Sequence, residues 1–373
     1  MGQDLPSPPL SLYIHIPFCL TRCGYCSFFS LSFNHSALET YLGYLHRELA
    51  SYRKLLTQPL SSVYFGGGSP ALLSAKQINL LMQDLALSPQ TEVTLEINPI
   101  QLTPSFLTSL STTPVNRLSI GVQSMIDSEL LWLDRRHKAQ QMPDRIKLCR
   151  DMGYNNISLD LIYGLPGSTT DSLVYSLDAL IALNPEHISC YLLSLDEDCA
   201  RYTDADKLPD EDSQFAQYEL IRSRLAAADY EHYEISNFAR DEHSSAHNLC
   251  YWQSNNYLAI GASAAGWISP IRYHNHANLQ DYYRSVEEGE CYPNQSICTP
   301  KRELEDYLMM GLRLLHGIHI PSCNLRFGID LITHYQAPIE RLCKLGMLQL
   351  EGDSLHLSEA ALFVSNSVIA ELI

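Results

Sequence analysis

The N-terminal half of the chain alternates short apolar runs with longer amphipathic stretches. From Leu12 to about Leu195, the apolar runs have the length of strands, and the stretches between them repeat apolar residues at helical spacing. Six runs are predicted as strands: Leu12–Ile16, Ser62–Phe65, Val93–Ile97, Arg117–Gly121, Ile157–Ile162 and His187–Leu192. The helices predicted between them are Leu38–Leu55, Ala75–Leu87, Pro104–Leu110, Met142–Met152 and Asp171–Leu183. This α/β order predicts a parallel sheet with helices outside it, either open or curled toward a barrel.

The second half of the chain follows a different pattern. An acidic connector at Asp196–Asp212 precedes a middle segment that is rich in aromatic residues, including Tyr233–Phe238 and Ala246–Trp267. Helical spacing then returns at Glu303–Leu315, near Pro321–Phe327 and at Asp330–Leu345, before a short hairpin at Met347–Leu357. Helices followed by a hairpin predict a winged-helix-like module. We therefore expect a barrel-like domain at 1–200, a connector and middle segment at 201–299 that completes the site, and a C-terminal module at 300–373.

Composition and charge limit the classes of partner. Apolar residues make up 46% of the chain and charged residues 18%, which is typical of a folded globular protein. No apolar run reaches the roughly 18 residues that a membrane span needs, and Met1–Leu10 lacks the features of a secretory signal. A net charge of −17 disfavours nucleic acid and anionic lipid as partners. We expect a cytoplasmic protein without a membrane span.

Three of the eleven cysteines, Cys19, Cys23 and Cys26, lie within eight residues in a C-x3-C-x2-C pattern directly after the first predicted strand. Three thiolates at this spacing can each bind one iron of a [4Fe–4S] cluster, which leaves the fourth iron open for a small molecule. Structural zinc is the alternative, but it prefers four protein ligands, and the nearby sequence offers no fourth cysteine or paired histidine. The other eight cysteines have no regular spacing and are typical of buried thiols in a reducing compartment.

Further polar or glycine residues lie at or near the ends of the predicted strands. Gly66–Pro70 follows the second strand, Glu96 lies near the end of the third, and Asp160 lies within the fifth, while Gln123 and Arg135 follow the fourth. Active groups of parallel α/β proteins gather at these strand ends. Glycines let a ligand approach the backbone, and a carboxylate such as Glu96 can accept hydrogen bonds from ribose hydroxyls. A simple turn at the glycines and a structural salt bridge at each charged residue are the alternatives.

These motifs carry a family resemblance. The segment Tyr13–Cys26 closely resembles the cluster motif of the radical S-adenosylmethionine (SAM) superfamily. Together with Gly66–Pro70, Glu96, Ser119–Ser124 and Asp160–Pro166, it resembles the oxygen-independent coproporphyrinogen III oxidase group, which includes the haem chaperones called HemW. The resemblance runs from Tyr13 to the C-terminus. It implies a partial (β/α)6 barrel, a [4Fe–4S] cluster and SAM, whose S–C5′ bond an electron from the reduced cluster breaks.

The resemblance also assigns residues to SAM. The positions that match the contacts to a first SAM molecule are Tyr13, Gly67 and Glu96. Those that match a second SAM pocket of the oxidase are Tyr25, Gly68, Ser69, Gln123, Arg135 and Asp160. No single side chain is assigned as a catalytic residue.

Two features of the sequence favour the chaperone branch. The oxidase has a further cysteine where this chain has Phe28, and its long N-terminal extension has no counterpart in the 18 residues before Cys19. The segment His247-Asn-Leu-Cys-Tyr-Trp252 matches the haem-binding H-N-x-x-Y-W motif of the chaperones, which makes His247 the candidate haem ligand. Many chaperone-like relatives have a histidine where this chain has Ala265.

The sequence thus predicts a haem chaperone-like radical SAM protein that binds haem and passes it to a recipient protein, with an electron donor as a further partner. The first alternative is a coproporphyrinogen III oxidase (dehydrogenase) of porphyrin biosynthesis, which would bind porphyrinogen instead. The second is a redox-sensing winged-helix regulator. From Pro300 onward, however, six Lys and Arg stand against nine Asp and Glu, whereas a DNA reader usually has a basic face.

Overall fold

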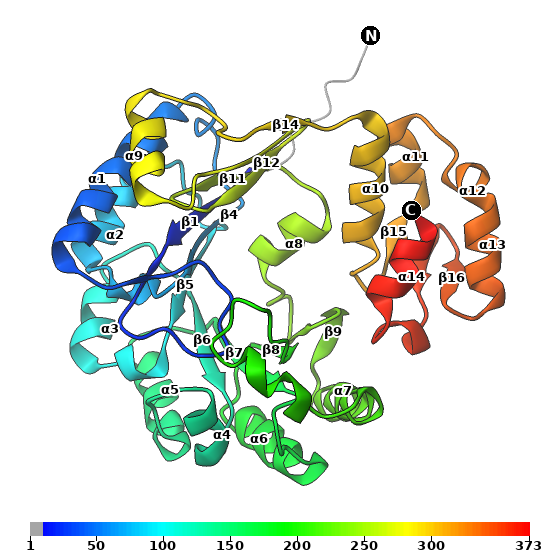
Figure 1. The fold of residues 1–373 in the computed structure, drawn as a ribbon, viewed down its shortest axis with the longest axis horizontal. Coiled ribbons are helices and arrows are strands. Elements are labelled where there is room, and N and C mark those ends of the chain that lie inside the picture. Colours follow the sequence, from blue (N-terminus) through cyan, green and yellow to red (C-terminus); the bar gives the residue numbers. More distant parts are fainter. Residues whose placement is uncertain (1–9) are drawn as a thin grey trace.

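The computed structural model describes residues 10–373, and its largest feature is a twelve-stranded sheet (Figure 1). The prediction that Met1–Leu10 carries no secretory signal concerns residues that, apart from Leu10, lie outside the described part. Within residues 10–373, no helix combines the length and the apolar character that crossing a membrane requires.

The six strands predicted from the sequence form the middle of this sheet and pair in parallel in chain order. Their bounds are β1 (Ser11–Ile16), β4 (Ser62–Gly67), β5 (Glu92–Ile97), β6 (Arg117–Gln123), β7 (Ile157–Tyr163) and β8 (His187–Leu192). Side chains on both faces of these strands are buried, which explains why the strands appear in the sequence as nearly continuous apolar runs.

The middle segment of the chain extends this sheet at both edges. At one edge β11 (Tyr257–Ile260) pairs in parallel with β1, and β12 (Ala265–Ile268), β13 (Ile271–His274) and β14 (Ser296–Ile297) follow it antiparallel. At the other edge β10 (Asn237–Ala239) and β9 (Glu231–Glu234) follow β8. The strand order is linear from β14 to β9, so among the described residues the sheet is curved but not closed. The predicted α/β partial barrel is confirmed.

Helices cover the outer face of the sheet (Figure 1). They are α1 (His35–Ser51), α2 (Ala75–Met82), α3 (Pro104–Leu110), α4 (Asp127–Trp132), α5 (Met142–Asp151) and α6 (Thr170–Ala182), followed by α7 (Glu211–Ala226) and α9 (Leu279–Glu287). Local signals fix their starts: Thr103 accepts a hydrogen bond from the backbone N–H of Phe106, and Pro104 occupies the first turn of α3. In contrast, α8 (Ala246–Trp252) lies on the inner side of the sheet.

The C-terminal module consists of helices and a small three-stranded sheet. The helices are α10 (Pro300–Gly311), α11 (Ile320–Phe327), α12 (Leu331–His334), α13 (Gln336–Lys344) and α14 (Ser365–Leu372), and the strands are β15 (Ile318–His319), β16 (Leu348–Glu351) and β17 (Ser354–Leu357). The predicted hairpin is present as β16 and β17. The prediction of one helix at Asp330–Leu345 is wrong, because Tyr335 leaves helical geometry and Pro338 has no N–H to donate to the preceding turn.

Candidate functional site

The three clustered cysteines lie on a loop that leaves the end of β1. The loop is closed at its base by the short parallel pair β2 (Phe18–Cys19) and β3 (Leu31–Ser32). Further along, the backbone N–H of Gly24 donates to Asp134 over 2.9 Å, and the N–H of Arg201 donates to the carbonyl of Gly24 over 3.0 Å. Because Arg201 and Asp134 also form an ion pair of 3.0 Å, the acidic connector helps to hold the cysteine loop in place.

The thiols of this loop are grouped and partly exposed. Cys19, Cys23 and Cys26 are all free and of intermediate exposure. The Ser69 hydroxyl donates to Cys19 Sγ over 3.7 Å, and Arg135 Nη1 donates to Cys23 Sγ over 3.7 Å. Partial burial raises the pKa of the Cys19 and Cys26 thiols. Iron bound to these thiols would counter this effect, because a coordinated thiol is deprotonated outright.

The loop carries three sulfur donors, Cys19, Cys23 and Cys26. Within residues 10–373, no group of three or more His, Cys, Asp or Glu side chains converges around one metal position. A single zinc ion needs such convergence, whereas in a cluster each thiolate binds a different iron. The loop offers three free thiols, and three sulfur ligands would leave one of four irons open.

Glycines let the cysteine loop approach the end of β4. A Cβ atom added at Gly68 would lie 2.8 Å from the carbonyl oxygen of Phe18 and 3.0 Å from Cys19 Sγ. Gly67 has a φ of +111°, and a Cβ there would meet the ring of His15 at 2.5 Å. The predicted turn after the second strand therefore begins inside β4, which runs through Gly67. Only glycine allows this close packing without displacing the loop.

The residues assigned to the first SAM molecule lie together. Glu96 Oε2 accepts a hydrogen bond of 3.1 Å from the Gly67 N–H, and its Oε1 accepts one of 2.9 Å from the Tyr64 hydroxyl. Tyr13 stacks against Tyr64 with 6.2 Å between ring centroids, and its hydroxyl pairs with His15 Nδ1 over 2.9 Å. Burial raises the pKa of Glu96 to about 7. A ligand that offers two hydroxyl donors would stabilise the ionised form of this carboxylate.

The residues assigned to a second SAM molecule form two groups. Gly68 and Ser69 border Cys19, as described above. The others surround the half-buried Arg135, whose Nη2 donates to the carbonyl of Gly121 over 2.5 Å. Burial lowers the pKa of Arg135, but the neighbouring Tyr25, Cys23 and Asp160 outweigh it and raise the pKa overall. Gln123 adopts a left-handed φ of 72° at the end of β6.

Asp160 completes this second group from β7. Burial raises the pKa of Asp160 to about 6, against the opposing influence of the cations Arg117 and Arg135. Of the residues that the sequence assigned to SAM, several lie at or just after the carboxyl ends of parallel strands: Gly67, Gly68, Ser69, Glu96 and Gln123. Tyr13 and Asp160 lie in the middle of β1 and β7, Tyr25 lies on the cysteine loop, and Arg135 lies on the loop after α4.

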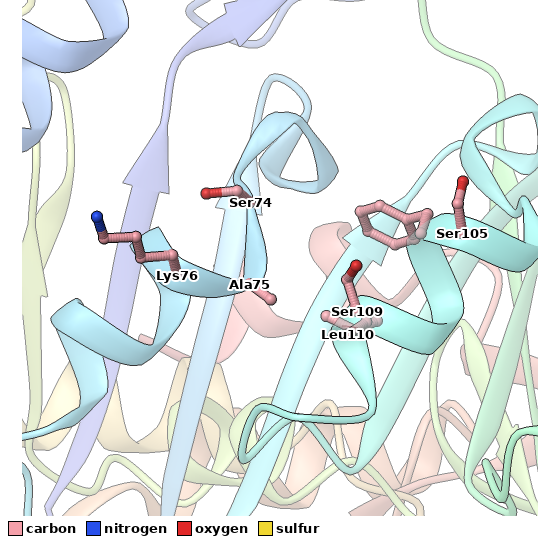
Figure 2. A pocket seen from close by; sticks show the side chains of 7 residues that line it. Ser74, Ala75, Lys76, Ser105, Ser109 and Leu110 are labelled. Carbon is pink, nitrogen blue, oxygen red and sulfur yellow. The ribbon is translucent and has the colours of Figure 1, made fainter.

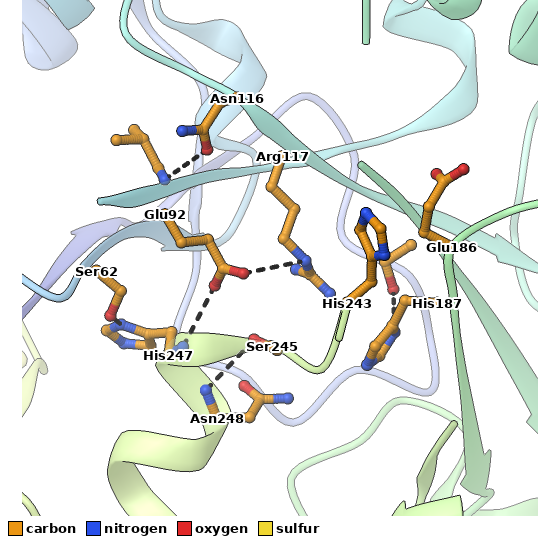
Figure 3. Close-up of polar contacts among 12 residues, drawn as sticks. Ser62, Glu92, Asn116, Arg117, Glu186, His187, His243, Ser245, His247 and Asn248 are labelled. Atoms are coloured by element: carbon orange, nitrogen blue, oxygen red, sulfur yellow. Dashed lines mark hydrogen bonds and ion pairs between the residues drawn. The ribbon is translucent and has the colours of Figure 1, made fainter. Parts of the chain in front are cut away.

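His247 lies in a hydrogen-bond network near the opposite ends of the strands (Figure 3). Its Nδ1 pairs with the Ser62 hydroxyl and its Nε2 with the Tyr251 hydroxyl, both over 2.8 Å. Only 1% of the residue is exposed, and burial lowers the pKa of its imidazole to about 3. The ring also stacks on Tyr64 at 5.0 Å. To bind haem iron, as the sequence predicts, His247 would have to exchange one of these hydrogen bonds for the metal.

The same network contains a charge pair that the sequence analysis missed. Arg117, at the beginning of β6, is 2% exposed, and its Nε lies 3.7 Å from Glu92 Oε2 at the beginning of β5 (Figure 3). Glu92 also accepts a hydrogen bond from the backbone N–H of His247 over 3.3 Å. The sequence signal was an arginine at the head of an otherwise apolar strand. This pair anchors α8 to the inner face of the sheet.

A cavity of about 390 Å³ separates α8 and the sheet edge from the C-terminal module. Its volume lies within the usual range of about 300–1,000 Å³ for small-molecule sites. Five aromatic side chains line it, together with two arginines and two carboxylates; the full lining is Tyr13, Tyr251, Trp252, Ser254, Tyr257, Ala265, Trp267, Arg272, Glu303, Asp306, Met310 and Arg326. Tyr13, in the middle of β1, belongs both to this wall and to the residues that the sequence assigned to the first SAM molecule.

A second pocket, of about 450 Å³, lies between the start of α2 and α3 (Figure 2). It is lined by Ser74, Ala75, Lys76, Ser105, Phe106, Ser109 and Leu110. This lining contains no cysteine, carboxylate or histidine and none of the residues predicted from the sequence. It is larger than the aromatic cavity, but it offers no group for the chemistry that the strand ends provide.

The chain matches known proteins over nearly its whole length. Residues 13–180 match the radical SAM superfamily, and residues 298–364 match the HemN C-terminal domain. The chain is 30% identical to the haem chaperone HemW of Lactococcus lactis subsp. lactis (strain IL1403) over 98% of this chain and 97% of that protein. It is 31% identical to the haem chaperone HemW of Bacillus subtilis (strain 168), with coverage of 96% and 97%.

A solved structure has the same fold. The coproporphyrinogen III oxidase HemN of Escherichia coli, a radical SAM enzyme, superposes with a TM-score of 0.86 over 99% of this chain and 91% of that one, at 21% identity. At this identity the likeness shows the shared fold alone.

Proposed function

Because the chain belongs to the HemW family of radical SAM proteins, we propose that it is a haem chaperone, which binds haem and passes it to a recipient protein. The relatives of that name align over nearly the full length of the chain, including the C-terminal module. The recipient, the electron donor and the cytoplasmic location predicted from the sequence belong to the same proposal.

The observation that carries the proposal is the aromatic cavity. Haem is a flat, mainly apolar ring with two carboxylates on one edge. The cavity offers Trp252, Trp267 and Tyr257 for the ring, and Arg272 and Arg326 for the carboxylates. Its wall includes Tyr13, which the sequence assigned to the first SAM molecule.

A [4Fe–4S] cluster and SAM are the cofactors of the radical SAM superfamily. We propose that Cys19, Cys23 and Cys26 hold the cluster, since they are the grouped, partly exposed thiols of the loop after β1. When bound, the reduced cluster would hold SAM at its open iron and supply an electron to it. Glu96 would accept hydrogen bonds from the SAM ribose.

Haem titration of the protein purified without air tests the proposal. We expect a saturable absorbance change at about one haem per chain, followed by transfer of the haem to an apo-haem protein in a second cuvette. Cys23→Ser should lower iron and sulfide content while leaving haem binding measurable. Cys298→Ser, which changes a partly exposed thiol outside the loop, is the matched control.

An activity assay separates the chaperone from the alternative, a coproporphyrinogen III oxidase. The reduced, cluster-loaded protein is incubated with SAM and coproporphyrinogen III in the absence of oxygen. Substrate-dependent 5′-deoxyadenosine together with protoporphyrinogen would show an oxidase and contradict the chaperone proposal. Saturable haem binding without either product would support it.

A further inference from the structure

The turn after α4 brings two charged side chains to the cysteine loop. Beyond Trp132, the last residue of the helix, the Asp134 N–H donates to the Leu131 carbonyl over 3.1 Å. The Arg135 N–H donates to the Leu130 carbonyl over 2.8 Å, which completes a Schellman cap. This cap gives Asp134 a left-handed φ of 54°, at a position where glycine is usual. An aspartate in this conformation points to a role for its side chain.

Asp134 and Arg135 contact neighbouring parts of the cysteine loop. The Asp134 carboxylate accepts the hydrogen bond of 2.9 Å from the Gly24 N–H. The Arg135 Nη1 donates to Cys23 Sγ over 3.7 Å, and its Nη2 donates to the carbonyl of Gly121 in β6. A Cβ atom at Gly121 would lie 2.6 Å from Arg135 Nη2, so the glycine lets the guanidinium approach the strand. The guanidinium is therefore held between the sheet and one of the three thiols.

The charge of Arg135 lies beside a thiol that is proposed to bind iron. Its two terminal nitrogens donate to a thiol and to a backbone carbonyl, and neither of these acceptors is a carboxylate. The residue is half-buried, so water and salt screen its charge less than that of its exposed neighbour Arg136. One-electron reduction adds a negative charge to a [4Fe–4S] cluster. A fixed cation beside a cluster thiolate stabilises that added charge.

We propose that Arg135 is a positioning residue for the cluster, which holds Cys23 through its sulfur and whose charge makes the bound cluster easier to reduce. The inference rests on the proposed binding of a [4Fe–4S] cluster by the three cysteines. Net charge and hydrogen bonds to the sulfurs are among the features that set the reduction potential of such clusters. The electron comes from a one-electron carrier, and no bond at Arg135 forms or breaks. This role needs no SAM, unlike the SAM contact that the sequence assigned to Arg135.

Redox titration of the reconstituted protein without SAM tests the inference. Titanium(III) citrate supplies the electron, and electron paramagnetic resonance measures the reduced cluster. Arg135→Met should lower the midpoint potential, by about 59 mV if the reduced cluster becomes tenfold less stable relative to the oxidised one. Arg136→Met is the matched control, because it removes the same charge from the next, exposed side chain, and it should keep the parent's potential.

Two further variants separate the charge from the hydrogen bond. Arg135→Lys keeps the charge, so its potential should lie closer to the parent's than that of Arg135→Met. Arg135→Gln keeps a donor without the charge, and its potential should also fall. Because SAM is absent, a lost SAM contact cannot cause these shifts. An arginine with a merely structural role would change the cluster content without ordering the potentials by charge.

The outcomes separate this inference from the proposed function. A parental potential in the cluster-loaded Met and Gln variants would overturn it, and so would an equal shift in Arg136→Met. If both uncharged variants are folded by circular dichroism but take up no iron, a cluster retained in Arg135→Lys would support the role of the charge, and its loss there would overturn it. If the parent itself takes up no iron and sulfide, the cluster proposal fails, whereas the haem titration tests the chaperone proposal independently.

Discussion

Substituting Gly68 by alanine should damage the cluster site while leaving the fold intact. The added Cβ would lie 2.8 Å from the Phe18 carbonyl oxygen, 2.9 Å from the Pro17 carbonyl carbon and 3.0 Å from Cys19 Sγ. Two of these are backbone atoms, held at the base of the loop by the β2–β3 pair, so they cannot move independently. Overpacking of this kind costs on the order of 1–3 kcal/mol. The strain falls on the first of the three cluster thiols.

The assay compares iron and sulfide per chain after reconstitution without air, together with the urea midpoint of the protein before reconstitution. We expect Gly68→Ala to hold clearly less iron and sulfide than the parent and to lose about 1–3 kcal/mol of stability. Gly43→Ala is the control, since a Cβ on this outer position of α1 meets no atom within 4 Å. It should gain up to about 1 kcal/mol from helix propensity and keep its cluster. Full cluster occupancy and parental stability in Gly68→Ala would refute the reasoning.

Three further changes test other parts of the structure. Arg117→Leu should cost about 3–5 kcal/mol in urea unfolding, because it leaves Glu92 without its buried partner; a loss below about 1 kcal/mol would contradict this. Burial raises the pKa of Glu48 to about 7, so the folded state binds an extra proton above pH 4.5 and stability should fall by up to about 3 kcal/mol as the pH rises to 7. Glu48→Gln should flatten that fall in denaturation curves measured across this range, and an unchanged slope would refute the assignment. Glu96→Gln should weaken SAM binding to the cluster-loaded protein about tenfold in calorimetry, since a charge-assisted hydrogen bond contributes about 1.5–3 kcal/mol; an unchanged affinity would exclude Glu96 from the SAM site.

The sequence predicted the central strands well because both of their faces are buried. The run Arg117–Gly121 lies within β6, and Pro104–Leu110 coincides with α3, where Thr103 and Pro104 provide start signals. Elements that depend on distant partners were harder to predict. The strand at Tyr257–Ile260 is short, and it is stabilised by pairing with β1, almost 250 residues earlier in the chain. Nothing in its local sequence distinguishes it from an aromatic loop.

In the candidate site, too, some features could be predicted from the sequence and others depend on distant parts of the chain. The spacing of Cys19, Cys23 and Cys26 and the order of the strand-end motifs are properties of the sequence. They predicted the family, which the comparisons confirm, and they are the basis for the proposed cluster and SAM residues. The environment of His247 is not such a property. Its sequence motif predicted a histidine that could bind haem iron. In the structure the imidazole is buried and both of its ring nitrogens form hydrogen bonds, whereas Tyr251 lines the cavity.

By itself, then, the sequence determined which groups this protein carries: three thiols at cluster spacing, glycines and carboxylates at strand ends, and an aromatic segment that contains His247. Only the tertiary structure decided which of these groups face an open space. The reason is that burial and hydrogen-bond partners come from chain segments far apart in sequence. Ser62 of β4, Tyr251 of α8 and Arg326 of the C-terminal module acquire their roles only when the sheet curves around α8.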